Sequence, residues 1–276
     1  MVSSLPLIFS RWVKKYGEGR DTDSRKGWSG TLATYRMQSL PYDPKQMLYV
    51  YQPIVAIDTG VVGYEALLRV RGRDIGPIFS AVESLGTEAQ IQFDKVTARL
   101  ASRGAAGWIG PNCRLFVNVM PGTVLHVLNG GVWPKAHVPH VVWEIPEGMS
   151  GTRAILQPGA IQVMRGAEIA LDDLGEGFGD LRKLASLPGV WCKLGRDLVR
   201  ACHLSDSTKA VIRHVVGLSE ELGQIVVAEG VETLEELKAL DGMGVRHIQG
   251  FLYGRPAERP KTGNIAEILE MARAMI

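Results

Sequence analysis

Short apolar runs alternate with helical patterns along most of this chain. From residue 48 onward, eight of these runs have the length and the Val, Ile and aromatic content of strands. They span residues 48–57, 61–70, 115–120, 140–145, 169–173, 190–194, 224–229 and 247–253. Strands that alternate with helices form a largely parallel sheet. Eight of them within residues 47–276 predict an α/β fold, a TIM-like (β/α)8 barrel, which usually takes about 250 residues.

Five helices are predicted among these strands, at residues 88–103, 179–187, 205–223, 234–240 and 264–275. The clearest is the third, because Ser205 can cap its first turn and Gly223 can end its last. Its apolar residues recur at helical spacing, which predicts a buried face made of Val211, Val215, Leu218 and Leu222.

The first two predicted strands are separated only by residues 58–60. A parallel crossover needs about a dozen residues or more, so these two strands must pair antiparallel. The sequence therefore predicts a barrel whose first strand runs against its neighbour.

Residues 1–46 differ from the rest in pattern and in charge. They have no strand pattern, and they carry eight Lys or Arg residues against four Asp or Glu residues, a net charge of +4. The whole chain has a formal charge of +2, so residues 47–276 sum to −2. We predict a basic N-terminal extension, 1–46, and a barrel domain, 47–276. So small a total charge argues against binding of polymeric nucleic acid.

The extension also raises the question of membrane contact. Phe9 and Trp12 stand beside Arg11, Lys14 and Lys15, a combination that suits a membrane interface. Because the apolar stretch is short and is interrupted by a proline, we favour packing against the barrel or disorder over membrane binding.

The sequence offers no signal for export or for crossing a membrane. No apolar run approaches the roughly 18 residues of a membrane helix, and residues 1–10 lack the charged start of a secretory signal. Cys113, Cys192 and Cys202 are too few and too scattered for a disulfide framework. We therefore expect a cytoplasmic protein.

Polar side chains stand at or just past the end of nearly every predicted strand. They are Glu65, Asn118, Glu144, Asp172, Asp173, Lys193, Glu229 and Gln249. The carboxyl ends of barrel strands form one face, where active sites are built, so we expect these groups to converge. Any one of them alone is more often a solvated loop residue or a helix cap, but seven such strand ends on one rim indicate an ion or a ligand.

Five of these residues are carboxylates, which repel one another unless cations or protons neutralise them. Because the candidate ligands are oxygens of Asp, Glu and Asn, they favour Mg²⁺ or Mn²⁺ over zinc. Adjacent Asp172 and Asp173 can serve two ions, a standard device for hydrolysing a phosphodiester. Lys193 would add positive charge beside the reacting phosphate.

Over about residues 48–256 the chain resembles the EAL-domain family, the phosphodiesterases of the bacterial second messenger cyclic di-GMP. The resemblance rests on eight ordered motifs. They are YQPI at 51–54, EALLR at 65–69, VNV at 117–119, EIPE at 144–147, DDLGEGFGDL at 172–181, Lys193, VVAEGVET at 226–233 and QGFLYGRP at 249–256. The resemblance implies a barrel with an antiparallel first strand and hydrolysis of cyclic di-GMP to the linear dinucleotide pGpG.

The resemblance also implies a role for each matched position. The metal ligands would be Glu65, Asn118, Glu144, Asp172, Asp173 and Glu229. The residues that assist the attacking water and hold the metal network would be Lys193 and Gln249, with Glu65 and Asp173. Gln52 and Arg69 would contact the dinucleotide, and a guanidinium is suited to phosphate. Glu147 would steady the loop after the fifth strand, residues 175–180.

Two departures from the family pattern leave the activity open. In the loop 174–180, Leu174, Glu176 and the Gly179–Asp180 pair replace the usual Phe, small hydroxyl residue and Ser pair. Gly195 stands where the family commonly has an acid two residues after the lysine. The alternative is a catalytically weak or dead domain that acts as a cyclic di-GMP receptor or as a protein-interaction module. Family members often couple dimerisation to the same loop, so a homodimer is a further expectation.

Overall fold

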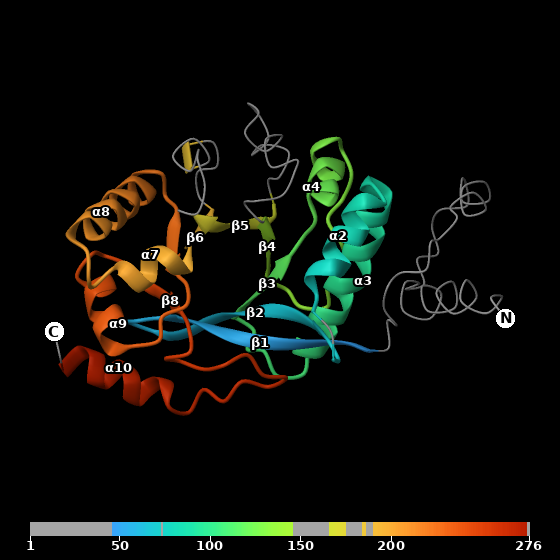
Figure 1. Ribbon diagram of the computed structural model, residues 1–276. Helices are drawn as coiled ribbons and strands as arrows, with labels where there is room; N and C mark the ends of the chain where they lie inside the picture. Colours follow the sequence, from blue (N-terminus) through green and yellow to red (C-terminus); the bar gives the residue numbers. More distant parts are fainter. Residues whose placement is uncertain (1–45, 73, 146–165, 175–183, 186–189, 275–276) are drawn as a thin grey trace, which may run out of the picture.

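The chain folds into a closed barrel of eight strands that follow one another in sequence order (Figure 1). The computed structural model describes residues 46–72, 74–145, 166–174, 184–185 and 190–274, and only the backbone of Asp173 and of residues 272–274. The strands are β1 (Met47–Ala56), β2 (Gly60–Val70), β3 (Arg114–Asn118), β4 (Val141–Ile145), β5 (Glu168–Leu174), β6 (Trp191–Leu194), β7 (Ile225–Ala228) and β8 (His247–Gln249). The predicted (β/α)8 barrel is confirmed.

Strand β1 runs against both of its neighbours. It pairs antiparallel with β2 and with β8, whereas every other neighbouring pair from β2 to β8 is parallel. A three-residue connection returns the chain from β1 to β2, and Gly60 adopts φ 92° there. The antiparallel first strand that the short connection predicted is therefore confirmed.

Helices cover the outside of the barrel, with α2, α3 and α4 on one side and α7, α8, α9 and α10 on the other (Figure 1). They are α2 (Gly76–Ser84), α3 (Thr87–Ala105), α4 (Pro121–Leu128), α7 (Arg196–Ala201), α8 (Asp206–Glu221), α9 (Leu234–Asp241) and α10 (Ile265–Ala274). Four match predicted helices within about two residues, and α2, α4 and α7 were not predicted. The predicted helix 179–187 lies outside the described residues except for positions 184 and 185.

Helix α8 begins as predicted, and its buried face overlaps the predicted face in part. The Ser205 side chain accepts a hydrogen bond from the Thr208 N–H at 3.2 Å, which confirms the cap. The fully buried residues are Ile212, Val216 and Ser219, while Val211 is 49% exposed. Val215, Leu218 and Leu222 are partly buried and pack against the core, so the predicted face is confirmed at these three positions and is wrong at Val211.

The last strand is shorter than the apolar run 247–253. After Gln249 the backbone packs against Val231, whose N–H donates to the Gln249 carbonyl and whose carbonyl accepts from the Leu252 N–H, both at 3.1 Å. A Cβ atom on Gly250 would lie 1.9 Å from the Val231 carbonyl oxygen. The chain therefore leaves the sheet at a position that only glycine can occupy.

The barrel interior is filled by an apolar layer of alternate residues from six strands. It consists of Ile54, Phe116, Val142, Ala170, Trp191 and Val227. The Phe116 and Trp191 rings meet edge to face with centroids 5.2 Å apart. A second, larger cluster fills the space between the strands and the surrounding helices. The interior layer therefore closes the barrel below the level at which the polar residues stand.

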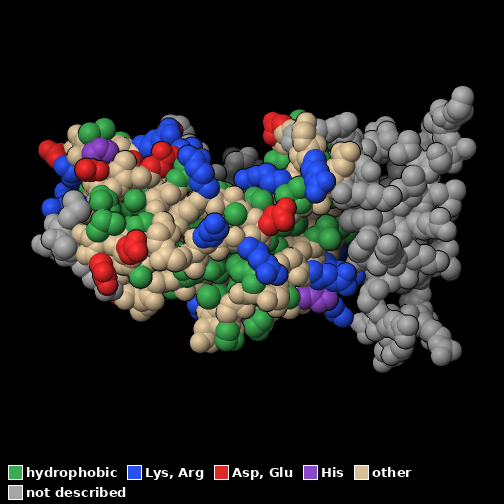
Figure 2. All heavy atoms as spheres, turned by 90° about the horizontal axis from the view of Figure 1, so that it is seen from below, with side chains coloured by type: hydrophobic (Ala, Val, Ile, Leu, Met, Phe, Trp, Pro, Cys, Tyr) green, Lys and Arg blue, Asp and Glu red, His purple; other side chains and the backbone are tan. Residues whose placement is uncertain are grey.

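The outer surface differs in charge from one region to another. On the face seen from below, which carries α10, Lys and Arg side chains spread across the middle and acidic side chains gather toward one end (Figure 2). Within the described part of the chain, no helix is long and apolar enough to cross a membrane.

Candidate active site

A polar layer lies directly on the apolar layer of the barrel. Strand side chains alternate between inside and outside, so a residue two positions further along points to the same side. From Phe116, Val142, Ala170, Trp191 and Val227, this step leads to Asn118, Glu144, Asp172, Lys193 and Glu229. On the antiparallel β1 the step runs backward, from Ile54 to Gln52, and Gln52 is the register partner of Glu65. The alternation thus gathers the predicted polar residues at one level.

Lys193 lies at the centre of this layer. Its Nζ atom is 2.5 Å from Glu229 Oε1, 2.7 Å from Glu144 Oε1 and 2.9 Å from Asp172 Oδ1. A fourth carboxylate, Glu65, lies 3.5 Å away. Burial lowers the pKa of the amine, but the four acids outweigh that effect and raise the pKa well above its ordinary value. Lys193 is therefore charged, and it binds four acids at once.

Four acids of the polar layer surround a single positive charge, the Lys193 ammonium. Glu144 is fully buried, and burial together with the neighbouring Glu65 raises the pKa of its carboxyl well above the ordinary value. Burial likewise raises the pKa of Glu229, and the Asp172 charge raises it further, against the attraction of Lys193. Burial and mutual repulsion thus oppose the ionisation of all four acids beside one ammonium, so this cluster attracts further cations or protons.

Amide side chains connect the acids to one another. Gln249 Nε2 donates to Glu65 Oε2 at 2.5 Å and to Gln52 Oε1 at 3.3 Å, and Gln52 Nε2 donates to the Gly254 carbonyl at 3.1 Å. Asn118 Nδ2 donates to Glu144 Oε2 at 3.0 Å and to Glu65 Oε1 at 3.4 Å. The orientation of Glu65 is therefore fixed by two amides that reach it from β3 and β8.

The donor set fits a hard divalent ion. Every candidate ligand is an oxygen donor, and the buried atoms Glu144 Oε1 and Asp172 Oδ1 face the Lys193 ammonium and no other described donor. As the described side chains stand, no three acidic, His or Cys groups are arranged to hold an ion, and the Lys193 ammonium lies between the acids. Asp173, predicted as a metal ligand and catalytic residue, has a side chain outside the described part of the structure.

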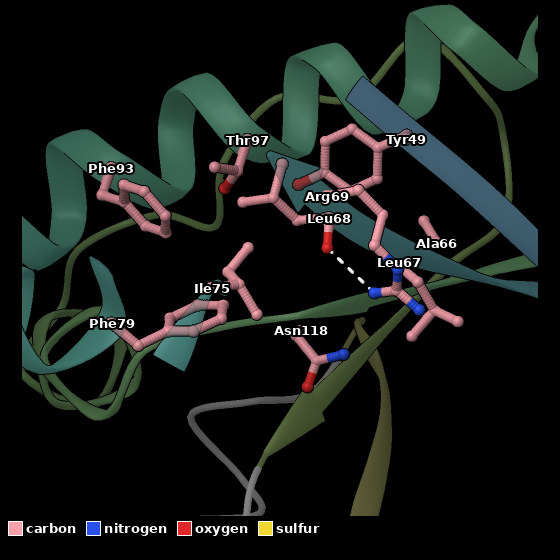
Figure 3. A pocket seen from close by; sticks show the side chains of 10 residues that line it. All are labelled: Tyr49, Ala66, Leu67, Leu68, Arg69, Ile75, Phe79, Phe93, Thr97 and Asn118. Carbon is pink, nitrogen blue, oxygen red and sulfur yellow. Dashed lines mark hydrogen bonds between the residues drawn. The ribbon is translucent and has the colours of Figure 1, made fainter. Parts of the chain in front are cut away.

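A cavity of about 190 Å³ adjoins the polar layer (Figure 3). Its lining residues are Tyr49, Ala66, Leu67, Leu68, Arg69, Ile75, Phe79, Phe93, Thr97 and Asn118. Arg69 lies at one end, where its guanidinium donates to the Leu68 carbonyl at 2.9 Å, and the Phe79 and Phe93 rings lie at the other (Figure 3). Because Asn118 lines the cavity and also binds Glu144, the cavity opens directly beside the acids.

The structure brings together eight of the predicted residues: Gln52, Glu65, Asn118, Glu144, Asp172, Lys193, Glu229 and Gln249. Arg69 stands apart from them at the cavity. Glu147 and the loop 175–180 lie outside the described residues. The aromatic residues of the cavity were missed, because Tyr49, Phe79 and Phe93 come from β1, α2 and α3 and meet only in the folded chain, and α2 itself was not predicted.

Gly195 occupies the position, two residues after Lys193, where the sequence resemblance predicts an acid. Arg196 follows it. Gly195 is the N-cap of α7, and its N–H donates to the Leu174 carbonyl at 2.9 Å. The Arg196 side chain lies across Gly230, where its Cγ would be 2.7 Å from an added Cβ, and its guanidinium pairs with Glu232 at 2.5 Å. The sequence did not predict this pair, which joins the loops that follow Lys193 and Glu229.

Fold and site together define a TIM-like barrel with a carboxylate-rich site in its mouth. Comparison with known proteins places the chain more narrowly: it belongs to the EAL-domain family, whose sequence model matches residues 37–256. The chain is 33% identical over 234 residues to an uncharacterized signaling protein of Caulobacter vibrioides. The aligned region covers 77% of this chain and 28% of that protein.

Other relatives carry names that refer to cyclic di-GMP. The cyclic di-GMP phosphodiesterase RocR of Pseudomonas aeruginosa is 30% identical over 220 residues, 75% of this chain and 56% of RocR. The calcium and cyclic di-GMP complex of Klebsiella pneumoniae BlrP1 superposes with a TM-score of 0.65 and 30% identity, over 77% of this chain and 56% of that chain. A manganese and cyclic di-GMP complex of BlrP1 gives a TM-score of 0.63. The chain therefore spans about half the length of these two relatives, and less of the Caulobacter protein.

Proposed function

We propose that this protein is a cyclic di-GMP phosphodiesterase that hydrolyses its substrate to pGpG with Mg²⁺ or Mn²⁺. One observation carries the proposal: four carboxylates, two glutamines, an asparagine and a lysine meet in one buried layer at the mouth of the barrel. Family membership and the names of the relatives support the substrate.

The metal ligands of the proposed enzyme are Glu65, Asn118, Glu144, Asp172, Asp173 and Glu229. When bound, a pair of divalent ions supplies an activated water and stabilises charge on the phosphate. The excess of four carboxylates over one ammonium at Lys193 supports this assignment, since divalent cations would stabilise the ionised carboxylates. The Lys193 ammonium now lies among the acids, and we expect it to turn toward the reacting phosphate once cations take its place.

The substrate contacts follow from the cavity beside the acids. Arg69 carries the positive charge and planar donors that bind a phosphate, and Gln52 stands at the edge of the polar layer. The aromatic side chains at the far end of the cavity offer an apolar wall for a base. The chain thus holds the dinucleotide with one phosphate over the acids.

A receptor without turnover is the second candidate. It is favoured by Gly195, which leaves the site without one acid that the family commonly has, and by the altered sequence of loop 174–180. In this candidate the same cavity binds cyclic di-GMP, and the missing acid prevents hydrolysis.

The deciding experiment incubates purified protein with cyclic di-GMP and either Mg²⁺ or Mn²⁺, and measures pGpG by chromatography. A Glu65→Ala variant is the inactive control. Formation of pGpG by the wild type alone supports the enzyme. Calorimetric binding of cyclic di-GMP without product supports the receptor, and the lack of both rejects the two candidates.

We further propose a location, an oligomeric state and a ligand for the whole protein. The reaction takes place in the cytoplasm, the active form is a homodimer, and cyclic di-GMP rather than a nucleic-acid polymer is the ligand. Size-exclusion chromatography with light scattering, with and without the ligand, tests the dimer.

A further inference from the structure

The first turn of α4 is capped by side chains of another helix. The residue before α4, Met120, has no side chain that can accept from the helix N-terminus, and α4 begins with a proline. The N–H of Met120 donates instead to Asp94 Oδ2 at 2.7 Å, and the N–H of Gly122 donates to Gln90 Oε1 at 2.7 Å. Both acceptors lie on α3, which packs beside α4 (Figure 1).

These two contacts are buried and tightly fitted. Asp94 is 1% exposed and Gln90 is 7% exposed. A Cβ atom on Gly122 would lie 2.6 Å from Gln90 Oε1, so a glycine there lets the glutamine reach the backbone. Buried backbone donors that lose their acceptor cost about 1–3 kcal/mol each, so these contacts hold the start of α4 firmly.

The segment held in this way carries a proposed metal ligand. Asn118 is the last residue of β3, two residues before Met120. Between them, the Val119 N–H donates to the Glu144 carbonyl at 3.0 Å. The backbone from 118 to 120 is therefore held by β4 on one side and by α3 on the other. The side chain of Asn118 can reach Glu65 and Glu144 only if this backbone keeps its path.

We propose that Asp94 and Gln90 are positioning residues for the metal site: by capping α4 they fix the backbone that aims Asn118 at Glu65 and Glu144. This inference rests on the proposed function, in which Asn118 is a metal ligand. Neither residue reaches the polar layer, so each acts through the backbone and not by contact with substrate or ion.

The test measures Mn²⁺ affinity by titration calorimetry in wild type, Asp94→Ala, Asp94→Asn and Gln90→Ala. Groups that orient metal ligands typically contribute 10–100-fold to metal affinity. We expect the alanine variant of Asp94 to bind Mn²⁺ at least about tenfold more weakly, and Gln90→Ala to show a smaller loss. The asparagine variant keeps an acceptor oxygen for the Met120 N–H and should restore the affinity to within about threefold of wild type.

A matched control separates positioning from general loss of stability. Val216→Ala removes buried apolar volume on α8, on the other side of the barrel from α3 and α4 (Figure 1), and should lower the melting temperature without weakening Mn²⁺ binding. If the control weakens binding as much as Asp94→Ala does, or if Asp94→Ala binds as tightly as wild type, the inference is overturned. Should Asp94→Ala fail to fold, unchanged affinity in Gln90→Ala overturns it equally.

The wild type separates this inference from the proposed function. A wild-type protein that binds neither Mn²⁺ nor Mg²⁺ overturns both. A wild type that binds Mn²⁺ and forms pGpG, with all variants unchanged, overturns only the role of Asp94 and Gln90.

Discussion

Lys193 and Glu229 come from neighbouring strands, and their charged groups are in direct contact at 2.5 Å inside the barrel. Three more acids surround the same ammonium. The lysine is thus the cation that makes this acidic layer compatible with burial when divalent ions are absent. Its removal should affect folding as well as catalysis.

Replacement of Lys193 by Met should destabilise the metal-free protein. Methionine fills similar space without charge, so the four acids lose their common partner, and removal of one member of a buried ion pair costs about 3–5 kcal/mol. We expect urea unfolding in EDTA to show a loss of that size, part of which Mn²⁺ restores. Turnover should fall by about 100-fold or more. A Lys193→Met protein as stable as wild type in EDTA would contradict this role.

Replacement of Gly195 by Asp should increase turnover. The residue lies at the N-cap of α7 with φ −59° and ψ 149°, a conformation that any residue can adopt, so the acid enters without backbone strain. Gly195→Ala is the matched control, because it adds a side chain without a carboxylate. A rise in kcat for Gly195→Asp, without a rise for Gly195→Ala, would show that the missing acid limits catalysis. Equal kcat values for wild type and both variants would rule that out.

Replacement of Arg69 by Ala should weaken substrate binding more than chemistry. The guanidinium lies at the end of the cavity and pairs with none of the acids whose side chains the structure describes, so its loss should raise KM by about tenfold while kcat changes little. Arg71→Ala, two residues further and outside the cavity lining, is the control. Steady-state kinetics of pGpG release distinguishes the two variants, and an equal KM in both would exclude a substrate contact by Arg69.

Asp94 should make stability depend on pH. Burial raises the pKa of its carboxyl to about 7, so between about pH 4 and 7 the folded protein holds a proton that the unfolded chain has lost. This contribution is complete at low pH and is lost as the pH rises through 7. Asp94→Asn, which cannot titrate, should therefore gain about 2 kcal/mol or more relative to wild type between pH 4.5 and pH 8. Urea unfolding of both proteins at the two pH values measures the difference, and parallel pH profiles would refute it.

Much of the barrel and its site could be predicted because both depend on local alternation. The strands have a period of two, and the polar residue that ends each run marks the same level of the barrel. Lys193 could be assigned to this level, but its contact with four acids depends on the closure of strands far apart in sequence.

Features that depend on contacts between elements escaped prediction. Helix α4 is short, begins with a proline and takes its cap from α3, so its own sequence gives little signal. The end of β8 is decided by the close approach of Gly250 to Val231, and the face of α8 by packing against the sheet. Each of these results from tertiary structure and not from local pattern.

The apolar layer under the polar one has a consequence for the order of events in the proposed reaction. Phe116, Val142, Ala170 and Val227 are fully buried and seal the barrel below the acids. In the proposed reaction, cyclic di-GMP, ions and pGpG cannot pass through this layer, so they enter and leave on the side of the acids. Product has to depart before the next substrate arrives, so pGpG should compete directly with cyclic di-GMP.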